Sequence, residues 1–179
     1  MLEIESQKLE PMHLVAVHHV GPFEETSKAW RTLNEFVSFR RLVSADPNVL
    51  AIGVCHDDPS CTPPEHFRYD ACLVVNDEAI KRENLTELVA ECQPSEPGQH
   101  IRLTSLDGGK FVKVRHVGPY ARTPAVYTDL LALAEREGAE VDPLPLLKVY
   151  LDHPLFTPPE RLRTDLLVRI KDSRRRRKS

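Results

Sequence analysis

Hydrophobic and polar residues alternate along two stretches of the chain that end in nearly the same letters. Residues 15–23 read VAVHHVGPF and residues 112–120 read VKVRHVGPY, 97 positions apart. Val15, Val17 and His19 fall on one face of an extended chain, as their counterparts do in the second stretch, which is the pattern of a strand with one buried face. The Gly-Pro pair then redirects the backbone. Each stretch therefore predicts a strand that ends at a corner.

A helical pattern follows each corner. We expect one helix to begin at Thr26 and another at Thr123, where Pro124 suits the first helical position. Apolar residues then recur with a period of 3.6 and give each helix one face to bury. These residues are Ala29, Trp30, Leu33, Phe36 and Val37 in the first helix, and Val126, Tyr127, Leu130, Leu133 and Ala134 in the second.

Two more strands are predicted after each helix, joined by a short TPPE turn at 62–65 or 157–160. With an offset of 95 residues, segment 57–75 matches segment 152–170, including Asp57 with Asp152, Arg68 with Arg163 and Asp70 with Asp165. Two matches in the same order indicate a duplicated unit. Turns this short require antiparallel neighbours. The predicted class is α+β, with tandem strand-helix-strand-strand units, an antiparallel sheet and pseudo-twofold symmetry.

The boundaries follow from these copies. We expect a single domain over residues 1–171, made of repeat one (about 2–75), a connector (76–99) and repeat two (about 100–171). Further extended segments at 2–7 and 100–106 precede the first strand of each copy, and the DGG of 107–109 predicts a hairpin in the second. Apolar residues from Ile80 to Cys92 predict one connecting helix.

Composition narrows the function classes. No stretch of the 179 residues approaches a membrane-spanning length of apolar residues, and the amino terminus lacks a signal-peptide pattern, so we expect a cytoplasmic protein with no membrane partner. The RRRRK run at 174–178 predicts a disordered basic tail over 172–179. The remaining 19 basic and 27 acidic residues leave an acidic body, which disfavours direct binding to nucleic acid.

Cysteine and histidine spacing gives little sign of a metal or cofactor. The four cysteines form no CxxC pair and are expected to be free thiols. A zinc site formed by Cys55, His56, Cys61 and His66 would fit no common ligand spacing. We therefore predict no metal and no cofactor.

The motifs HVGPF, TPPE, RYDACLVV, HVGPY and TPPERLRTDLLVRI together resemble the GyrI-like effector-binding family over about residues 2–171. The resemblance implies a ligand groove at the pseudo-dyad that binds drug-like molecules, often lipophilic cations, as in multidrug binding. The chain leaves no room for a helix-turn-helix domain, so a stand-alone sensor, scavenger or enzyme is expected. Some family members hydrolyse cyclopropane-bearing electrophiles, and one restrains DNA gyrase.

Candidate site residues follow from the resemblance and from strand alternation. Asp165 matches an acidic residue that many members carry as Glu, and Tyr150 lies on a strand expected to pair with it. If both side chains point into one space, they could orient a water molecule as a catalytic pair. The alternative is a structural Asp165 paired with Arg163 or Arg169. Aromatic candidates for ligand binding, each of which could equally be core, are Trp30, Tyr127, Phe23, Tyr120 and Phe156.

The function expected from the sequence is binding of a small hydrophobic, cationic molecule between the two repeats. The first alternative is hydrolysis of a strained or electrophilic small molecule such as a cyclopropanoid. The second is a protein-interaction role such as gyrase inhibition, with DNA gyrase as the partner. His19 and His116 are expected to build the two strand-to-helix corners rather than to do chemistry.

Overall fold

The computed structural model describes residues 2–40, 50–82 and 84–172. They form one eight-stranded antiparallel sheet in the order β1-β6-β8-β7-β3-β4-β2-β5. The strands are β1 (Glu5–Leu9), β2 (Met12–Val20), β3 (Ala51–Cys55), β4 (Arg68–Val75), β5 (His100–Leu106), β6 (Gly109–Val117), β7 (Val141–Tyr150) and β8 (Arg163–Ile170). The helices are α1 (Thr26–Arg40), α2 (Asp77–Arg82), α3 (Leu85–Glu91) and α4 (Thr123–Arg136), with short 3-10 turns η1 (Phe23–Glu25), η2 (Pro64–His66), η3 (Tyr120–Arg122) and η4 (Pro159–Arg161).

The centre of the sheet lies between β3 and β7. Gly53 sits directly opposite Lys148 in the register of this pair. The offset of 95 residues that aligns the two copies also takes Gly53 onto Lys148. A pseudo-twofold axis relating the copies therefore passes between these two residues. The α+β class and the antiparallel sheet predicted from the sequence are confirmed.

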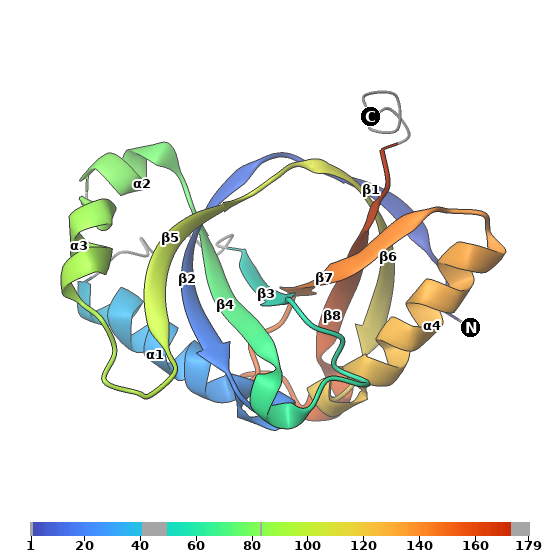
Figure 1. Cartoon of the computed structure of the whole chain (residues 1–179), viewed down its shortest axis with the longest axis horizontal. Helices are drawn as coiled ribbons and strands as arrows, with labels where there is room; N and C mark the ends of the chain where they lie inside the picture. Colours follow the sequence, from blue (N-terminus) through green and yellow to red (C-terminus); the bar gives the residue numbers. More distant parts are fainter. Residues whose placement is uncertain (1, 41–49, 83, 173–179) are drawn as a thin grey trace.

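Two long strands cross from one half of the molecule to the other. The register from Glu5↔Lys113 to Leu9↔Gly109 continues without a shift from Met12↔Leu106 to His18↔His100. β1 and β2 thus behave as one strand and β5 and β6 as its partner, and Figure 1 shows them arching together over the sheet. Each copy therefore contributes an outer strand to the other copy.

The hairpin predicted at residues 107–109 is wrong. β5 pairs with β2, and β6 pairs with β1 and β8, so the glycines connect two strands that are not each other's neighbours. A Cβ at Gly108 would lie 2.7 Å from the carbonyl oxygen of Leu9 and 2.7 Å from Cδ of Pro11. A side chain at position 108 would clash with these atoms, so glycine allows the two crossing strands to approach closely.

Strand alternation divides the apolar residues between the two faces of the sheet. Figure 1 shows α1 alongside the half formed by β2, β4 and β5, and α4 alongside the half formed by β6, β7 and β8. On this helix-covered face, Val17, Leu33 and Ala71 pack with Leu130 and Leu166 in one core. A second core occupies the opposite face and contains Leu14, Ala16, Ile52, Val54, Cys72, Phe111, Leu147, Val149 and Leu167.

The connector differs from its prediction. It contains two short helices, α2 and α3, rather than one, because Asn84 between them adopts a left-handed conformation with φ of 47°. The basic run predicted to be a disordered tail lies outside the described residues. Within residues 2–40, 50–82 and 84–172, the structure contains no helix with the length and apolar character needed to cross a bilayer.

Candidate functional site

Aromatic side chains from both halves meet at the pseudo-twofold axis, on the helix-covered face. We call Phe23, Trp30, Tyr69, Tyr120 and Tyr150 the aromatic cluster. The Trp30 ring lies 5.3 Å from the Tyr150 ring at 85°, and the Tyr120 ring lies 5.3 Å from it at 80°. These are edge-to-face contacts, which aromatic quadrupoles favour. Each copy thus supplies one ring that packs on Tyr150, and both flanking rings are half-buried.

A chain of hydrogen bonds links three members of the aromatic cluster. Trp30 Nε1 donates to Tyr69 Oη at 2.8 Å, and the hydroxyls of Tyr69 and Tyr150 are 2.8 Å apart. Burial raises the pKa of both phenols, that of Tyr69 well above its usual value. Both hydroxyls therefore stay protonated at neutral pH, where they can donate or accept hydrogen bonds but cannot act as bases.

Gly53 makes room for these hydroxyls. A Cβ at this position would lie 2.3 Å from Tyr69 Oη and 2.9 Å from Tyr150 Oη. The central strand therefore needs a residue without a side chain where the two phenols meet. The equivalent position in the second copy holds Lys148, so the two halves differ greatly in side-chain size at the axis itself.

Lys148 places a cation beside the aromatic cluster. Its side chain is buried, with the residue 2% exposed. Its Nζ donates to Thr123 Oγ1 at 2.8 Å and lies 4.2 Å from the centre of the Phe23 ring. Burial lowers the pKa of this ammonium group, because removal from water disfavours the charged form. The ionisable group at the axis is therefore a basic one, whereas the sequence predicted a carboxylate there.

The structure brings three of the predicted binding residues together with the catalytic candidate Tyr150, and it separates the other two. Trp30, Tyr120, Tyr150 and Phe23 belong to the aromatic cluster. Tyr127 is the sequence equivalent of Trp30, but it is 1% exposed in the helix-covered core and its hydroxyl donates to the Pro143 carbonyl at 2.9 Å. Phe156 is 83% exposed in the loop after β7, with its ring 5.0 Å from that of His153.

Asp165 lies on the other face of the sheet. In the β7–β8 register it faces Val149, whereas Tyr150 faces Thr164, so the two side chains point in opposite directions. The predicted pairing of Asp165 with Tyr150 is therefore wrong. The carboxylate accepts two hydrogen bonds from Arg115, at 2.7 and 3.0 Å, and lies 3.8 Å from Lys113 Nζ. Neither Arg163 nor Arg169, the partners considered as the alternative, fills this role.

Packed rings occupy the axis where the resemblance implied a groove. Two surface grooves lie elsewhere. One, of about 890 Å³, runs between α1 and residues 92–96 and is lined by polar side chains that include Lys28, Arg31 and Glu35. The other, of about 520 Å³, lies beside the end of β6 and includes Phe156 and Arg161.

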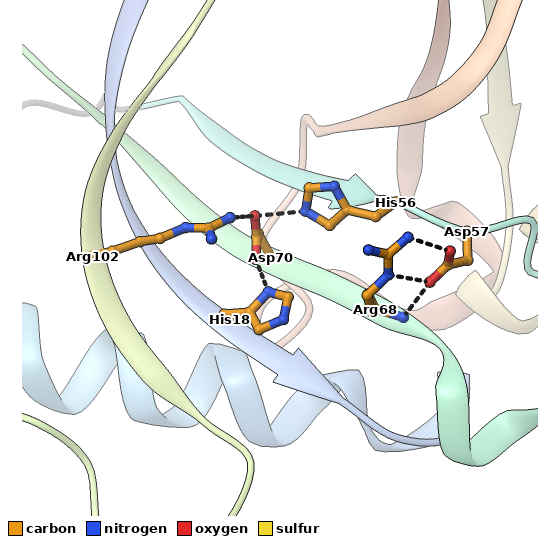
Figure 2. Close-up of polar contacts among 6 residues, drawn as sticks. All are labelled: His18, His56, Asp57, Arg68, Asp70 and Arg102. Carbon is orange, nitrogen blue, oxygen red and sulfur yellow. Dashed lines mark hydrogen bonds and ion pairs between the residues drawn. The ribbon is translucent and has the colours of Figure 1, made fainter.

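A second group of polar residues lies on the face opposite the helices. We call His18, His56, Asp70 and Arg102 the His–Asp cluster (Figure 2). His18 Nδ1 is 2.6 Å from Asp70 Oδ1, His56 Nε2 is 2.7 Å from Asp70 Oδ2, and an Arg102 nitrogen is 2.5 Å from the same Oδ2. Burial alone would raise the pKa of Asp70. The hydrogen bonds from both histidines and the charges of His56 and Arg102 outweigh it and hold that pKa well below its usual value.

The zinc set considered from the sequence is not assembled. Cys55 packs in the core of the helix-covered face, whereas the next residue, His56, points to the opposite face and bonds Asp70. Successive residues of a strand point to opposite faces, which separates these two potential ligands.

Two matching ion pairs close the β3–β4 and β7–β8 connections. Asp57 accepts bonds from the backbone N–H and the guanidinium of Arg68, as Figure 2 shows. Asp152 and Arg163 repeat the same arrangement in the second copy. The arginine partners lower the pKa of both carboxyl groups. This part of the repeated sequence therefore holds the two connections in place and does not carry out chemistry.

The corner histidines are also held by structural contacts. His116 Nε2 lies 3.1 Å from the Pro119 carbonyl oxygen, and His19 Nδ1 lies 3.3 Å from the side-chain nitrogen of Gln99. The corner glycines donate across the turn, Gly21 to Phe67 and Gly118 to Leu162. Both corners therefore tie the end of the first strand to the start of the last strand of the same copy.

Sequence reasoning missed three residues of this site. These are Tyr69, Gly53 and Lys148. A signal existed for two of them. Lys148 is the one charged residue in the apolar run LLKVYL, and Gly53 interrupts the apolar strand AIGVC. A glycine inside a strand often marks a close approach of other atoms.

Comparison with known proteins places this arrangement in a family. The sequence model of the GyrI-like small molecule binding domain matches residues 2–171. The chain belongs to this family. Among curated proteins, none matches the sequence. The GyrI-like domain therefore accounts for both repeats and the connector.

Solved structures share this GyrI-like fold at low sequence identity. A hydrolase from Listeria innocua is 19% identical with a TM-score of 0.63, over 94% of this chain and 92% of that one. The C-terminal domain of EcmrR is 15% identical with a TM-score of 0.68, over 96% and 99%. SAV2435 bound to tetraphenylphosphonium is 12% identical with a TM-score of 0.58, over 98% of both chains. At these identities the likeness concerns the fold alone.

Proposed function

We propose that this GyrI-like domain binds a small hydrophobic molecule with flat rings at the aromatic cluster. The observation that carries the proposal is the convergence of half-buried rings from both halves on Tyr150, beside the buried ammonium group of Lys148. Aromatic faces and edges recognise flat apolar molecules, and the phenols add hydrogen-bonding groups. The ligand would insert by displacing Trp30 and Tyr120 from their edge contacts, since the rings now fill the axis.

The same geometry bears on the charge of the ligand. The resemblance implied a cationic ligand and an acidic residue, Asp165, at the site, but Asp165 lies across the sheet and is bonded to Arg115. Lys148 already occupies the face of Phe23. The ammonium form of Lys148 would repel a second cation at the axis, whereas an anion would stabilise that form. We therefore propose a hydrophobic anion or an acidic molecule rather than a lipophilic cation.

Binding without turnover is the preferred form of this proposal. Hydrolysis would need a base beside the phenols, and burial keeps both Tyr69 and Tyr150 protonated. The hydrolase from Listeria innocua shares the fold alone, so it does not favour an enzymatic role here. No observation in the described residues favours gyrase as a partner.

The test uses two probes of one shape and opposite charge, tetraphenylborate and tetraphenylphosphonium. Trp30 is the single tryptophan of the chain, so tryptophan emission reports directly on the aromatic cluster. We expect saturable changes in emission, with tetraphenylborate bound about tenfold more tightly or better, because unit charges about 4 Å apart interact by several kcal/mol at an effective dielectric near 20. Lys148→Met should abolish that preference.

Matched variants decide where the probe binds. Tyr120→Ala should weaken binding, whereas Phe156→Ala, which removes an exposed ring outside the cluster, and Asp165→Asn, on the opposite face, should leave it unchanged. Emission unaffected by either ion, or binding lost only in Phe156→Ala, would overturn the site. Tighter binding of tetraphenylphosphonium would overturn the charge assignment and restore the cation. Product formed from a cyclopropane-bearing electrophile would overturn binding without turnover.

A further inference from the structure

The His–Asp cluster offers metal-binding donors in a place that the aromatic cluster does not use. One nitrogen from each of His18 and His56 and one oxygen of Asp70 all lie within 4.8 Å of one another. His18 comes from β2 and Asp70 from β4, His56 directly follows β3, and Figure 2 shows both imidazoles directed at the carboxylate. Two imidazoles and one carboxylate are a donor set suited to Zn²⁺ and similar divalent ions.

The second copy of the repeat serves as an internal comparison. The equivalent of Asp70 is Asp165, which one arginine, Arg115, neutralises with two hydrogen bonds at 2.7 and 3.0 Å. Arg115 is the equivalent of His18 under the 97-residue offset, and Leu151 is the equivalent of His56 under the 95-residue offset. The buried aspartate of the second copy is thus paired with one arginine, with Lys113 Nζ a further 3.8 Å from its carboxylate. The first copy instead supplies two imidazoles, each of which can bind a metal ion.

Access and orientation also suit an ion. The side chains of His18 and His56 are 18% and 29% exposed, whereas that of Asp70 is 4% exposed. Solvent therefore reaches the imidazoles while the carboxylate is held from within the sheet. Arg102 contacts Asp70 Oδ2 and is 38% exposed, so it can orient the carboxylate from outside the ligand set or move into water.

We propose that His18, His56 and Asp70 form a divalent cation site of the Zn²⁺ type, with water completing the coordination. In the metal-free protein one ring N–H of each imidazole donates a hydrogen bond to the carboxylate, so each ring must carry its proton on the other nitrogen before the freed nitrogen can bind the ion. The ligand atoms must spread from 2.6–2.7 Å to roughly 3.3 Å, the separation expected around a tetrahedral ion with bonds near 2.0 Å. Three protein ligands leave one position open to water.

The experiment titrates the chelator-treated full chain with Zn²⁺ and Co²⁺. We expect one equivalent to bind, a rise in melting temperature, and a Co²⁺ visible spectrum of a tetrahedral nitrogen and oxygen site. The double variant His18→Arg with His56→Leu copies the second half-site and should lose binding at least about tenfold. Its tryptophan emission, which reports on the distant aromatic cluster, shows whether it has folded.

A control removes two exposed imidazoles elsewhere, with His13→Gln and His66→Gln, and should keep full affinity. Arg102→Gln should bind the ion more tightly, because it removes a positive charge next to Asp70. Three outcomes would overturn the site: no stoichiometric binding, binding unchanged in the double variant, or a sulfur-to-cobalt absorption band that assigns the ion to cysteine. None of them bears on the proposed ligand at the aromatic cluster.

Discussion

At the scale of single residues, two unusual residues lie at the pseudo-twofold axis: a glycine that leaves space for other side chains, and a buried lysine. Gly53 and Lys148 face each other across β3 and β7. The first leaves space for two hydroxyls, and the second holds an ammonium group away from water with one hydrogen bond to Thr123. Both features cost stability in an otherwise apolar core, which is typical of positions kept for function.

Gly53→Ala tests the close approach of the two phenols. The added Cβ would lie 2.3 Å from Tyr69 Oη, so the hydroxyls must move and the variant should lose about 1–3 kcal/mol of unfolding free energy. Urea unfolding measures the loss. The same substitution combined with Tyr69→Phe and Tyr150→Phe should cost less, because the clashing oxygens are gone. A variant as stable as the parent would contradict the packing described for the aromatic cluster.

Lys148→Met tests the cost of the buried charge. The pKa of Lys148 is lowered in the folded protein, so between that pKa and 10.5 the unfolded chain binds more protons and stability rises with pH. Below this window the parent bears the full cost of the buried ammonium. We expect the variant to be more stable at pH 7 by roughly 1 kcal/mol. The gap should narrow at pH 10, as measured by urea unfolding at both values. A gap that widens with pH would contradict the shift.

At the scale of elements, alternation along the strands was predictable and contacts between distant strands were not. The sequence places Asp165 and Leu167 on one face of the last strand and Leu166 and Val168 on the other, and the structure agrees. What alternation does not reveal is which face the helices cover. The aromatic rings lie on the helix-covered face and Asp165 lies on the other, so Asp165 cannot contact them. The resemblance had implied that both lie on the same face.

The local signals that misled prediction have physical explanations. The DGG of 107–109 is a turn signal when only neighbours in sequence are considered. In the structure, however, Gly108 is packed against Leu9 and Pro11, which lie about a hundred residues away in sequence. The single connecting helix was predicted from apolar spacing alone, which does not register the left-handed backbone at Asn84. The Trp30 and Tyr127 positions are equivalent in sequence but find different hydrogen-bond acceptors.

The matching ion pairs Asp57–Arg68 and Asp152–Arg163 predict that both copies lose stability in acid in the same way. Asp57 and Asp152 have lowered pKa values, so their contribution is present at neutral pH and is lost as pH falls below 3.8 through the folded values. Asp57→Asn and Asp152→Asn should each lower the melting temperature at pH 7 and lower it by less at pH 3. Glu160→Gln, which changes a nearby exposed acid outside these ion pairs, is the control. Equal losses at both pH values would contradict the role of charge.

At the scale of the whole molecule, the sheet makes the two repeats dependent on each other. β1 of the first copy pairs with β6 of the second, β5 of the second pairs with β2 of the first, and β3 pairs with β7. Three of the seven strand pairings therefore join the copies, and the aromatic cluster takes rings from both. The site exists only when both halves are folded together.

This dependence predicts that neither half folds alone. Fragments 1–76 and 77–179 would each expose unpaired edges of β3 or β7 and of the crossing strands, together with apolar faces that the other fragment covers. When each fragment is heated alone, its circular dichroism signal should therefore change without a cooperative melting transition. Mixed at equal concentration they should regain the transition, with a midpoint that rises with concentration because assembly is bimolecular.

The tryptophan emission of fragment 1–76 should shift at the same stoichiometry, since Trp30 gains Tyr150 and Tyr120 as neighbours. Independent cooperative melting of either fragment would mean that the repeats are separate folding units, and the binding site would then have to be sought within one half.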